Sequence, residues 1–257
     1  LALVKGDPSD RRHFLDALMV MRTPRLAGVK ADYDRVLRQR NSLLKTAGAA
    51  RRSGGDASAL ATLDVWDDHL ARSGAEVVAA RLELLDALRP HVAEAYAQVA
   101  AKADPSRVDA SCTYKPSFEI ADGAGRDELN AGFTAAIAER RREELERGIS
   151  LVGPHRDDIT FTLGDMPAKG YASHGESWSF ALACRLASYH LLRDEGDDPI
   201  LILDDVFAEL DRSRRDQLAA LVGEAEQVMV TAAVSEDVPA ELRGARYDVR
   251  DGVVSRA

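Results

Sequence analysis

A short apolar run that ends in two carboxylates constrains the fold of this chain more than any other segment. Residues 200–205 read Ile-Leu-Ile-Leu-Asp-Asp. Such a continuous apolar run is typical of a strand that is buried on both faces of a sheet. A second apolar run occupies residues 228–230, and helical patterns occupy about 176–193 and 212–223. Strands that alternate with helices in this way predict an α/β layer in the C-terminal part of the chain.

Three further strand signals are present. Residues 159–163 alternate apolar side chains with threonine before a Gly-Asp turn, and residues 247–254 predict a terminal hairpin around a second such turn. A short strand is also compatible with the spacing of Tyr114, Phe118 and Ile120.

The first half of the chain carries helical patterns instead. Apolar residues recur at helical spacing over 29–44 and 63–99, and residues 46–58, rich in Gly, Ser, Ala and Arg, predict a loop between two antiparallel helices. Pro90 is expected to kink or divide the second helix. A projecting helical arm and an ordinary bundle fit this pattern equally well. Further helices are predicted at 126–147 and before residue 22, where Ser9 is the expected N-cap.

Bulk properties exclude several classes of protein. The chain has 257 residues and a formal net charge of -9, so it is not a basic DNA-wrapping protein as a whole, although local arginine patches can still meet nucleic acid. Cys112 and Cys184 stand far apart in no metal-ligand spacing, which predicts reduced thiols and a cytoplasmic location. No segment approaches the roughly 20 apolar residues of a membrane helix. The first residue is Leu1 rather than Met, so we expect the sequence to be a fragment.

The carboxylates at 204 and 205 are the strongest candidates for chemistry. Open α/β sheets bind ligands at the carboxyl ends of their strands. Asp204 is a candidate Mg²⁺ ligand through water, and Asp205 is a candidate for orienting or deprotonating an attacking water. The alternative is that the two acids simply cap a strand end.

A second candidate lies at the predicted start of the helix near 176. Ser173 and Gly175 there offer a hydroxyl, orphan backbone N–H groups and close backbone access to an anion such as a phosphate. Glu176 stands beside them, and it either faces that ligand or serves the helix dipole. An ordinary serine cap explains the same residues.

Two weaker candidates and one missing motif complete the sequence evidence. Residues 153–158, Gly-Pro-His-Arg-Asp-Asp, favour a polar surface loop, although Arg156 is able to meet phosphate and His155 to bond within the loop. Asp211 opens the helix after residue 210 and is either an N-cap or part of a longer motif. No Gly-x-x-x-x-Gly-Lys-Ser/Thr sequence (the Walker A loop) occurs, so the chain as it stands is expected to bind ATP weakly or not at all.

The order and spacing of these segments resemble the RecF family of bacterial recombination mediators, which have an ABC/SMC-like ATPase head. The resemblance covers nearly the whole chain and is carried by residues 3–16, 153–158, 173–176 and 201–211. It implies an α/β fold: a partial ABC-type ATPase head, a sheet with flanking helices, plus an inserted, mostly helical arm or bundle. It also implies a division into residues 1–22 (part of the head or a junction), 23–148 (arm) and 149–257 (C-terminal part of the head). The last part would hold the signature loop at 173–177, the Walker B strand at 199–205 and the D-loop at 210–211.

The resemblance assigns roles to the candidates. It implies Asp204 for Mg²⁺, Asp205 for water activation, Ser173 and Gly175 for the γ-phosphate of a nucleotide held by a second copy, and Asp211 for the dimer seam. Glu176 and Thr231 join the nucleotide-binding candidates. Thr231 stands where a switch residue that touches the γ-phosphate belongs, and this residue is often His. No DNA-contact residue carries over.

The function implied is that of an ATP-dependent dimer with slow ATPase activity. Such a dimer binds single-stranded, gapped or junction DNA and helps to load the recombinase with other mediator proteins during DNA replication, gap repair and the SOS response. Family members carry the Walker A loop further upstream. Two alternatives remain: a non-enzymatic helical module that binds protein or DNA without nucleotide, and a chromosome-structural SMC protein, which the short helical hairpin disfavours.

Overall fold

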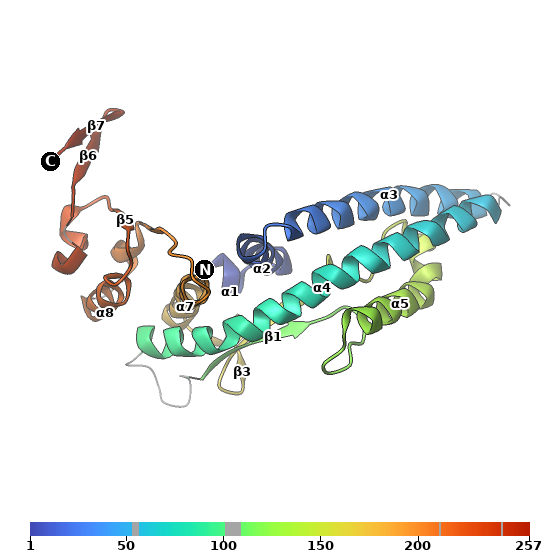
Figure 1. Cartoon of the computed structure of the whole chain (residues 1–257), viewed down its shortest axis with the longest axis horizontal. Helices are drawn as coiled ribbons and strands as arrows, with labels where there is room; N and C mark the ends of the chain where they lie inside the picture. The colour runs from blue at the N-terminus through green and yellow to red at the C-terminus, as the bar shows by residue number, and fades with distance from the viewer. Residues whose placement is uncertain (53–56, 101–108, 211, 243) are drawn as a thin grey trace.

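The computed structural model describes residues 1–52, 57–100, 109–210, 212–242 and 244–257. The molecule is elongated, with a long helical hairpin at one end and a small β-hairpin at the C-terminus at the other (Figure 1). The N-terminus lies between these two ends, beside the middle of the body. Among the described residues, none of the helices combines the length and the apolar content required to span a bilayer.

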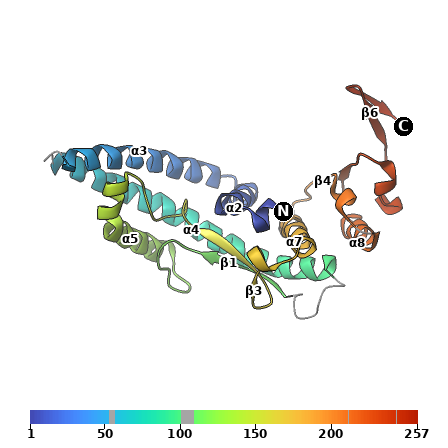
Figure 2. The ribbon, with the colours of Figure 1, turned by 180° about the vertical axis from the view of Figure 1, so that it is seen from behind.

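Three long helices form the arm. They are α3 (Leu26–Arg52), α4 (Ala57–Val99) and α5 (Arg126–Arg147). Helices α3 and α4 run side by side, and α5 lies along α4 on the other side, as the view from behind also shows (Figure 2). Their shared core contains Tyr33, Leu70 and Phe133, each at most 1% exposed. Gly74 allows this close approach, because a Cβ there would lie 2.4 Å from Cε1 of Phe133.

One expectation for these helices is wrong, and of the two outcomes expected at Pro90, a kink or a division, the division does not occur. The loop expected at 46–58 does not begin at 46, because α3 continues to Arg52. Alanine and arginine dominate residues 47–52, and their high helix propensity outweighs Gly48. Pro90 does not divide α4 either. A proline removes one backbone hydrogen bond, but Leu88, Val92 and Ala95 on both sides of it are buried in the main core and hold the helix together.

A three-stranded antiparallel sheet and three helices, two of them short, join the arm to the C-terminal part. The elements are α1 (Ala2–Lys5), α2 (Pro8–Arg22), β1 (Ala110–Lys115), β2 (Asp158–Leu163), β3 (Met166–Pro167) and α6 (Ala168–Tyr171). The sheet order is β1-β2-β3, with Cys112 opposite Phe161. The strand expected to include Phe118 and Ile120 stops at Lys115, because Pro116 cannot donate to the ladder. The N-cap of α2 is Asp7, with a capping box to Asp10, rather than Ser9.

The C-terminal part is an α/β layer. Its elements are α7 (His174–Asp194), β4 (Leu201–Asp204), a 3₁₀ turn η2 (Val206–Glu209), α8 (Arg212–Val222), β5 (Val228–Thr231), two 3₁₀ turns η3 (Ser235–Asp237) and η4 (Ala240–Leu242), β6 (Tyr247–Arg250) and β7 (Val253–Arg256). Strands β4 and β5 pair in parallel, with Asp204 opposite Thr231. Strands β6 and β7 form the expected antiparallel hairpin.

The main core unites the second half of α4 with this layer. Phe180 of α7 is fully buried, and its ring lies 5.4 Å from that of Tyr96 and 5.1 Å from that of Phe161. Helix α4 therefore contributes to both the arm core and the main core. One expectation fails here: residues 200–203 are not buried on both faces, because Ile202 is 66% exposed while Leu203 is 5% exposed. Only one face of the β4–β5 pair packs against the main core.

Candidate functional site

A hydrogen-bonded polar cluster occupies the carboxyl end of the parallel strand pair. The register places Asp204 and Thr231 directly opposite each other. The Thr231 hydroxyl donates to Asp204 Oδ1 over 2.5 Å, and the same hydroxyl oxygen accepts from the Asp205 backbone N–H over 3.1 Å. All three residues are exposed, and they lie at the edge where open α/β sheets bind ligands.

Asp205 has an uncommon backbone conformation. Its φ of 51° and ψ of 24° lie in the left-handed region, where only glycine is unstrained, although aspartate and asparagine tolerate it better than most residues. The Asp205 N–H also donates to the Thr231 carbonyl oxygen over 3.1 Å. Strain of this kind is concentrated at functional sites, since the surrounding structure must stabilise it.

The N-terminus of α7 is closed by a capping box. The Ser173 side-chain oxygen accepts from the Glu176 backbone N–H over 3.2 Å, and the Ser173 N–H donates to the Glu176 carboxylate over 2.7 Å. Glu176 therefore completes the helix start, which is the helix-dipole alternative that the sequence leaves open. The Ser173 hydroxyl is exposed at the helix tip and keeps a hydrogen atom to donate.

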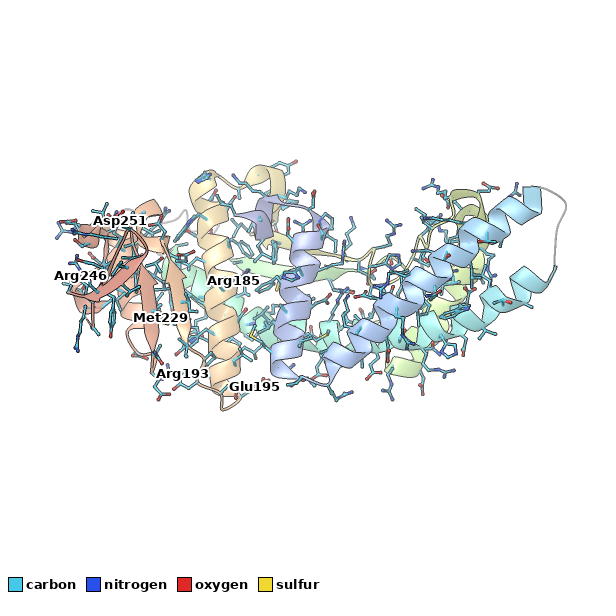
Figure 3. The ribbon with its side chains drawn as sticks, turned by 90° about the horizontal axis from the view of Figure 1, so that it is seen from above. Arg185, Arg193, Glu195, Met229, Arg246 and Asp251 are labelled. Carbon is cyan, nitrogen blue, oxygen red and sulfur yellow. The ribbon has the colours of Figure 1, made fainter. Side chains whose placement is uncertain are left out.

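The helix tip and the strand end lie at the same end of the α/β layer. A Cβ built on Gly175 would lie 3.4 Å from both terminal nitrogens of the Arg214 guanidinium. Arg214 belongs to the first turn of α8, and the turn η2 alone separates that region from Asp205. Figure 3 shows the opposite end of α7, where Arg193 and Glu195 are labelled, with the strand pair running alongside the helix. The tip of α7 therefore packs beside the start of α8, the helix that follows the strand end in the chain.

Asp204 and Asp205 suit a magnesium ion that keeps water ligands better than a metal ion whose ligands all come from the protein. Among the described residues, no group of three or more His, Cys, Asp or Glu side chains is placed to hold a metal. Mg²⁺ is commonly held by one or two carboxylates, with water and substrate phosphates completing its octahedron. Asp204, exposed and oriented by Thr231, suits that arrangement. Asp211 lies outside the described residues.

The 153–158 loop is a polar junction that is buried at Gly153, Pro154 and Asp157 and exposed at Arg156. Asp157 is fully buried; its carboxylate accepts from the Tyr114 hydroxyl over 2.6 Å and from the Ser117 N–H over 2.7 Å. Burial raises the pKa of Asp157 despite these hydrogen bonds. His155 lies 2.6 Å from the Tyr33 hydroxyl through Nδ1, and burial lowers its pKa to about 4. Arg156 is exposed, and its Nε and Nη2 donate to the Ser150 carbonyl oxygen.

Two buried arginines that the sequence reasoning missed hold this junction in place. Arg81 on α4 is 1% exposed and donates to Asp16 on α2 over 2.7 Å and to the Pro154 carbonyl oxygen over 2.7 Å. Arg40 on α3 is fully buried and donates to Asp67 and to Glu144 over 2.6 Å each. Nothing in their spacing distinguishes them from solvated arginines on a helix face.

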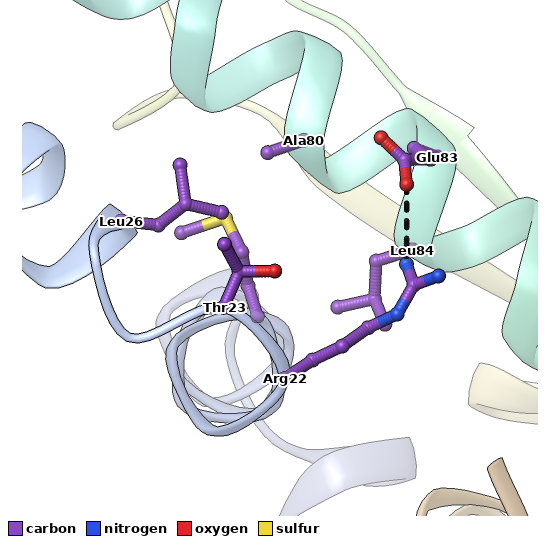
Figure 4. Close-up of a pocket in the computed structure, with 7 residues that line it drawn as sticks. Arg22, Thr23, Leu26, Ala80, Glu83 and Leu84 are labelled. Atoms are coloured by element: carbon purple, nitrogen blue, oxygen red, sulfur yellow. Dashed lines mark hydrogen bonds and ion pairs between the residues drawn. The ribbon is translucent and has the colours of Figure 1, made fainter. Parts of the chain in front are cut away.

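A shallow pocket between α2, α3 and α4 does not belong to the site. Met19, Thr23, Leu26, Ala80 and Leu84 line it, and an Arg22–Glu83 ion pair of 3.5 Å crosses its rim (Figure 4). This ion pair is partly exposed, and the other lining groups are apolar apart from one hydroxyl. We interpret the pocket as a gap in helix packing.

Comparisons with known proteins identify the family. The chain is 58% identical over 256 residues to the DNA replication and repair protein RecF of Streptomyces avermitilis, covering 100% of this chain and 67% of the relative. It is 57% identical over 299 residues to the RecF of a Nocardioides species, covering 100% of this chain and 71% of that relative. The chain belongs to the RecF family. This RecF-family chain thus spans about two thirds of the length of these relatives.

Solved RecF structures share the fold. The recombination mediator protein RecF of the RecFOR pathway, solved with ATPrS, matches with a TM-score of 0.84 at 24% identity, covering 99% of this chain and 65% of that one. The RecF structure with ATP matches with the same TM-score. The expected fold class, a partial ABC-type head with a large helical segment, is confirmed. No protein-family model matches the chain.

Proposed function

We propose that this chain is the larger part of an ATP-dependent recombination mediator that acts in DNA replication, gap repair and the SOS response in the cytoplasm. The observation that carries the proposal is the match of the entire chain, at 57–58% identity, to relatives named DNA replication and repair protein RecF. The solved RecF structures with ATP and ATPrS support ATP as the nucleotide. The cluster at the end of the α/β layer offers two of the groups that such a nucleotide site requires, a carboxylate for Mg²⁺ and an acid for water activation, whereas the Walker A loop does not occur in this sequence.

In this proposal, the strand end and the helix tip serve different nucleotides. Asp204 holds Mg²⁺ with water and phosphate oxygens, and the hydrogen bond from Thr231 orients its carboxylate. Asp205, beside it, orients or deprotonates the attacking water. When bound, the ion would neutralise charge on the phosphate oxygens.

The tip of α7 acts on the nucleotide of a second copy. Ser173 donates its hydroxyl to the γ-phosphate, and Gly175 leaves the backbone accessible to it. Glu176 contributes by completing the capping box, which fixes the geometry of the tip. Asp211 is assigned to the seam between the copies. We further propose residues 1–22, 23–148 and 149–257 as head or junction, arm and C-terminal head, with α4 shared between cores.

DNA is the proposed macromolecular ligand. Single-stranded, gapped or junction DNA would be bound by the ATP-bound dimer, which would cooperate with other mediator proteins to load the recombinase. The relatives' printed names support DNA as the target, and the solved proteins' titles support a pathway with other mediators.

Substitution of Asp205 by Asn tests the proposal. The experiment uses the restored protein, defined as this chain joined to an upstream segment of a RecF relative that carries a Walker A loop. Asparagine tolerates the left-handed backbone of position 205, so the variant removes the charge without adding strain. We expect slower hydrolysis and a longer-lived ATP-dependent dimer. Unchanged hydrolysis and dimer lifetime would reject the role of Asp205, and DNA binding that ignores ATP would favour a non-enzymatic binding module.

A further inference from the structure

Residues 3–16 are among the stretches that carry the family resemblance, yet the nucleotide chemistry proposed above gives them no role. They form α1, a tight turn and the first part of α2. Val4 and Phe14 are buried in the main core together with Phe180 of α7. Arg185 of α7 lies over the Phe14 ring, with its Cζ atom 5.2 Å from the ring centroid (Figure 3). This segment therefore packs directly against α7.

One backbone carbonyl in the turn has two cationic partners. The Gly6 carbonyl oxygen accepts from Arg11 Nη1 over 3.0 Å and from Lys169 Nζ over 2.9 Å. Arg11 is 3% exposed, and its Nε and Nη2 donate to the two carboxylate oxygens of Asp158 on β2 over 2.6 and 3.0 Å. A bidentate pair of this kind holds the guanidinium in one geometry. Strand β2 thus fixes the position of the Gly6 carbonyl through Arg11.

The turn has no room for a side chain at Gly6. A Cβ there would lie 2.3 Å from the Ala2 carbonyl oxygen and 2.3 Å from Asp10 Oδ2. The first of these atoms belongs to the backbone of α1, and the second accepts the Asp7 N–H in the capping box of α2. The turn is therefore held tightly, with its carbonyl oxygen between the two cationic donors.

Lys169 connects this carbonyl to the segment that leads into α7. It lies in α6, four residues before Ser173, where the ψ of Lys169 (116°) and the φ of Gly170 (92°) depart from helical values. Ala168, directly before it, is 1% exposed in the main core, whereas residues 169–171 are exposed. The lysine therefore ties an exposed, irregular connection to the turn between α1 and α2.

We infer that the α1–α2 turn positions the tip of α7, with Lys169 and Arg11 as positioning residues that act through the Gly6 carbonyl oxygen. An irregular connection that is anchored has fewer accessible conformations, so Ser173 and the capping box that it opens are held in one place. The consequence for the nucleotide rests on the proposed function, because only a tip that meets the γ-phosphate of a second copy requires this placement. The bracing itself requires no nucleotide.

Hydrogen exchange of the chain alone tests the bracing. Lys169→Met removes the ammonium donor and keeps an apolar stem of similar length. We expect the amides of Glu176 and Ser177, which donate to Ser173, to exchange about fivefold to tenfold faster in this variant, since the start of α7 opens more often. Lys169→Arg retains N–H donors and should keep the wild-type exchange. Lys115→Met, at an exposed lysine of β1, is the control and should also keep it.

Two results of this experiment would overturn the inference. One is unchanged exchange of both amides in Lys169→Met. The other is an equal increase in the amides of β1, which would show a general loss of stability rather than a local release of the tip.

ATP-dependent dimerisation of the restored protein tests the consequence. The tip is proposed to act on the nucleotide of the other copy, so Lys169→Met should weaken dimerisation by about tenfold without changing the affinity of each copy for ATP. Lys169→Arg and Lys115→Met should dimerise as the wild type does. Light scattering over a range of protein concentrations measures the dimer, and a fluorescent ATP analogue measures the affinity. If the tip exchanges faster but dimerisation is unchanged, the bracing is supported and the proposed role of the tip at the nucleotide is rejected.

Discussion

Thr231 and Asp204, 27 residues apart in the sequence, are joined by a 2.5 Å hydrogen bond at the carboxyl end of a parallel strand pair. The hydroxyl donates to one carboxylate oxygen and leaves the other oxygen of Asp204 facing solvent. A bond of this kind orients an acidic side chain toward a ligand without neutralising it. We therefore predict a positioning role for Thr231, one that does not require a histidine.

Replacing Thr231 by Val should weaken Mg²⁺-dependent hydrolysis in the restored protein. Valine keeps the shape and removes the donor to Asp204, so we expect apparent Mg²⁺ affinity to fall by about tenfold to a hundredfold. Stability should change by no more than about 1.5 kcal/mol, because the pair is exposed. Thr231→Ser keeps the hydroxyl and should retain activity. Equal Mg²⁺ dependence in the valine and serine variants would contradict the positioning role.

Replacing Gly175 by Ala should leave the stability of the fold nearly unchanged but should prevent contact between the tip of α7 and a nucleotide. The added Cβ would lie 3.4 Å from the Arg214 guanidinium, which is ordinary contact. The free energy of unfolding, obtained from thermal unfolding, should therefore change by no more than about 0.5 kcal/mol. The methyl group should nevertheless block a phosphate from approaching the tip of α7. We expect ATP-dependent dimerisation of the restored protein, measured by light scattering, to be lost. Normal dimerisation of the alanine variant would exclude a phosphate at this tip.

Replacing Gly74 by Ala should destabilise the arm. Its Cβ would lie 2.4 Å from Phe133, whose ring is fully buried and has no room to move, so we expect a loss of about 1–3 kcal/mol in urea unfolding. Gly28→Ala in α3 is the matched control, since its Cβ meets nothing within 4 Å. That control should be neutral or should stabilise by up to about 1 kcal/mol. A similar result for both glycines would show that the arm helices are not packed this closely.

Replacing Arg40 by Met should leave Glu144 buried without its cationic partner, while Asp67 keeps only Arg141. Glu144 is fully buried and Asp67 is 7% exposed, so we expect a loss of about 3–5 kcal/mol. Arg35→Met removes an exposed ion pair with Asp32 and should cost at most about 0.5 kcal/mol. Urea denaturation of both variants measures the difference. If the Arg40 variant loses as little as the control, the buried network does not stabilise the arm.

His155 should make the fold less stable as the pH falls below neutrality. Its folded pKa of about 4 lies below the ordinary value of 6.5, so the unfolded chain binds the proton first and stability is lost between pH 6.5 and 4. The contribution is about 3 kcal/mol over that window. The raised pKa of Asp157 acts in the opposite direction near the lower end, because the folded state then binds a proton more readily.

The difference between the wild-type chain and His155→Gln isolates this contribution. Urea unfolding at several pH values should show a smaller loss of stability between pH 6.5 and 4 in the variant. His13→Gln, at an exposed position of α2, should keep the wild-type dependence. Identical pH profiles for all three proteins would show that His155 does not resist protonation in the fold.

Sequence patterns anticipated the elements with the clearest local signals. Residues 126–147 form the expected helix α5 to the residue, and the strands near 159–163, 201–204 and 228–231 lie where apolar alternation or runs placed them. Hydrophobic periodicity and turn residues depend on a few neighbouring positions, so such elements can be predicted from the local sequence alone. The expected end of α3 was wrong because the helix propensity of residues 47–52 outweighs Gly48, and the continuity of α4 through Pro90 was not predicted because burial of its flanking residues in the main core decides it.

The candidate site likewise depends partly on local sequence and partly on tertiary packing. The sequence alone determined which residue types stand at the helix tip and the strand end, through the order of 173–176 and 200–205, and its similarity to relatives determined the family. Only the tertiary structure decided that Thr231 bonds Asp204, that Gly175 meets Arg214, and that the 153–158 loop is buried against Arg81. Contacts between residues far apart in the sequence depend on how whole elements pack, and no local spacing contains that information. The exposure of Ile202 was decided in the same way, since an apolar residue is buried only where another layer covers it.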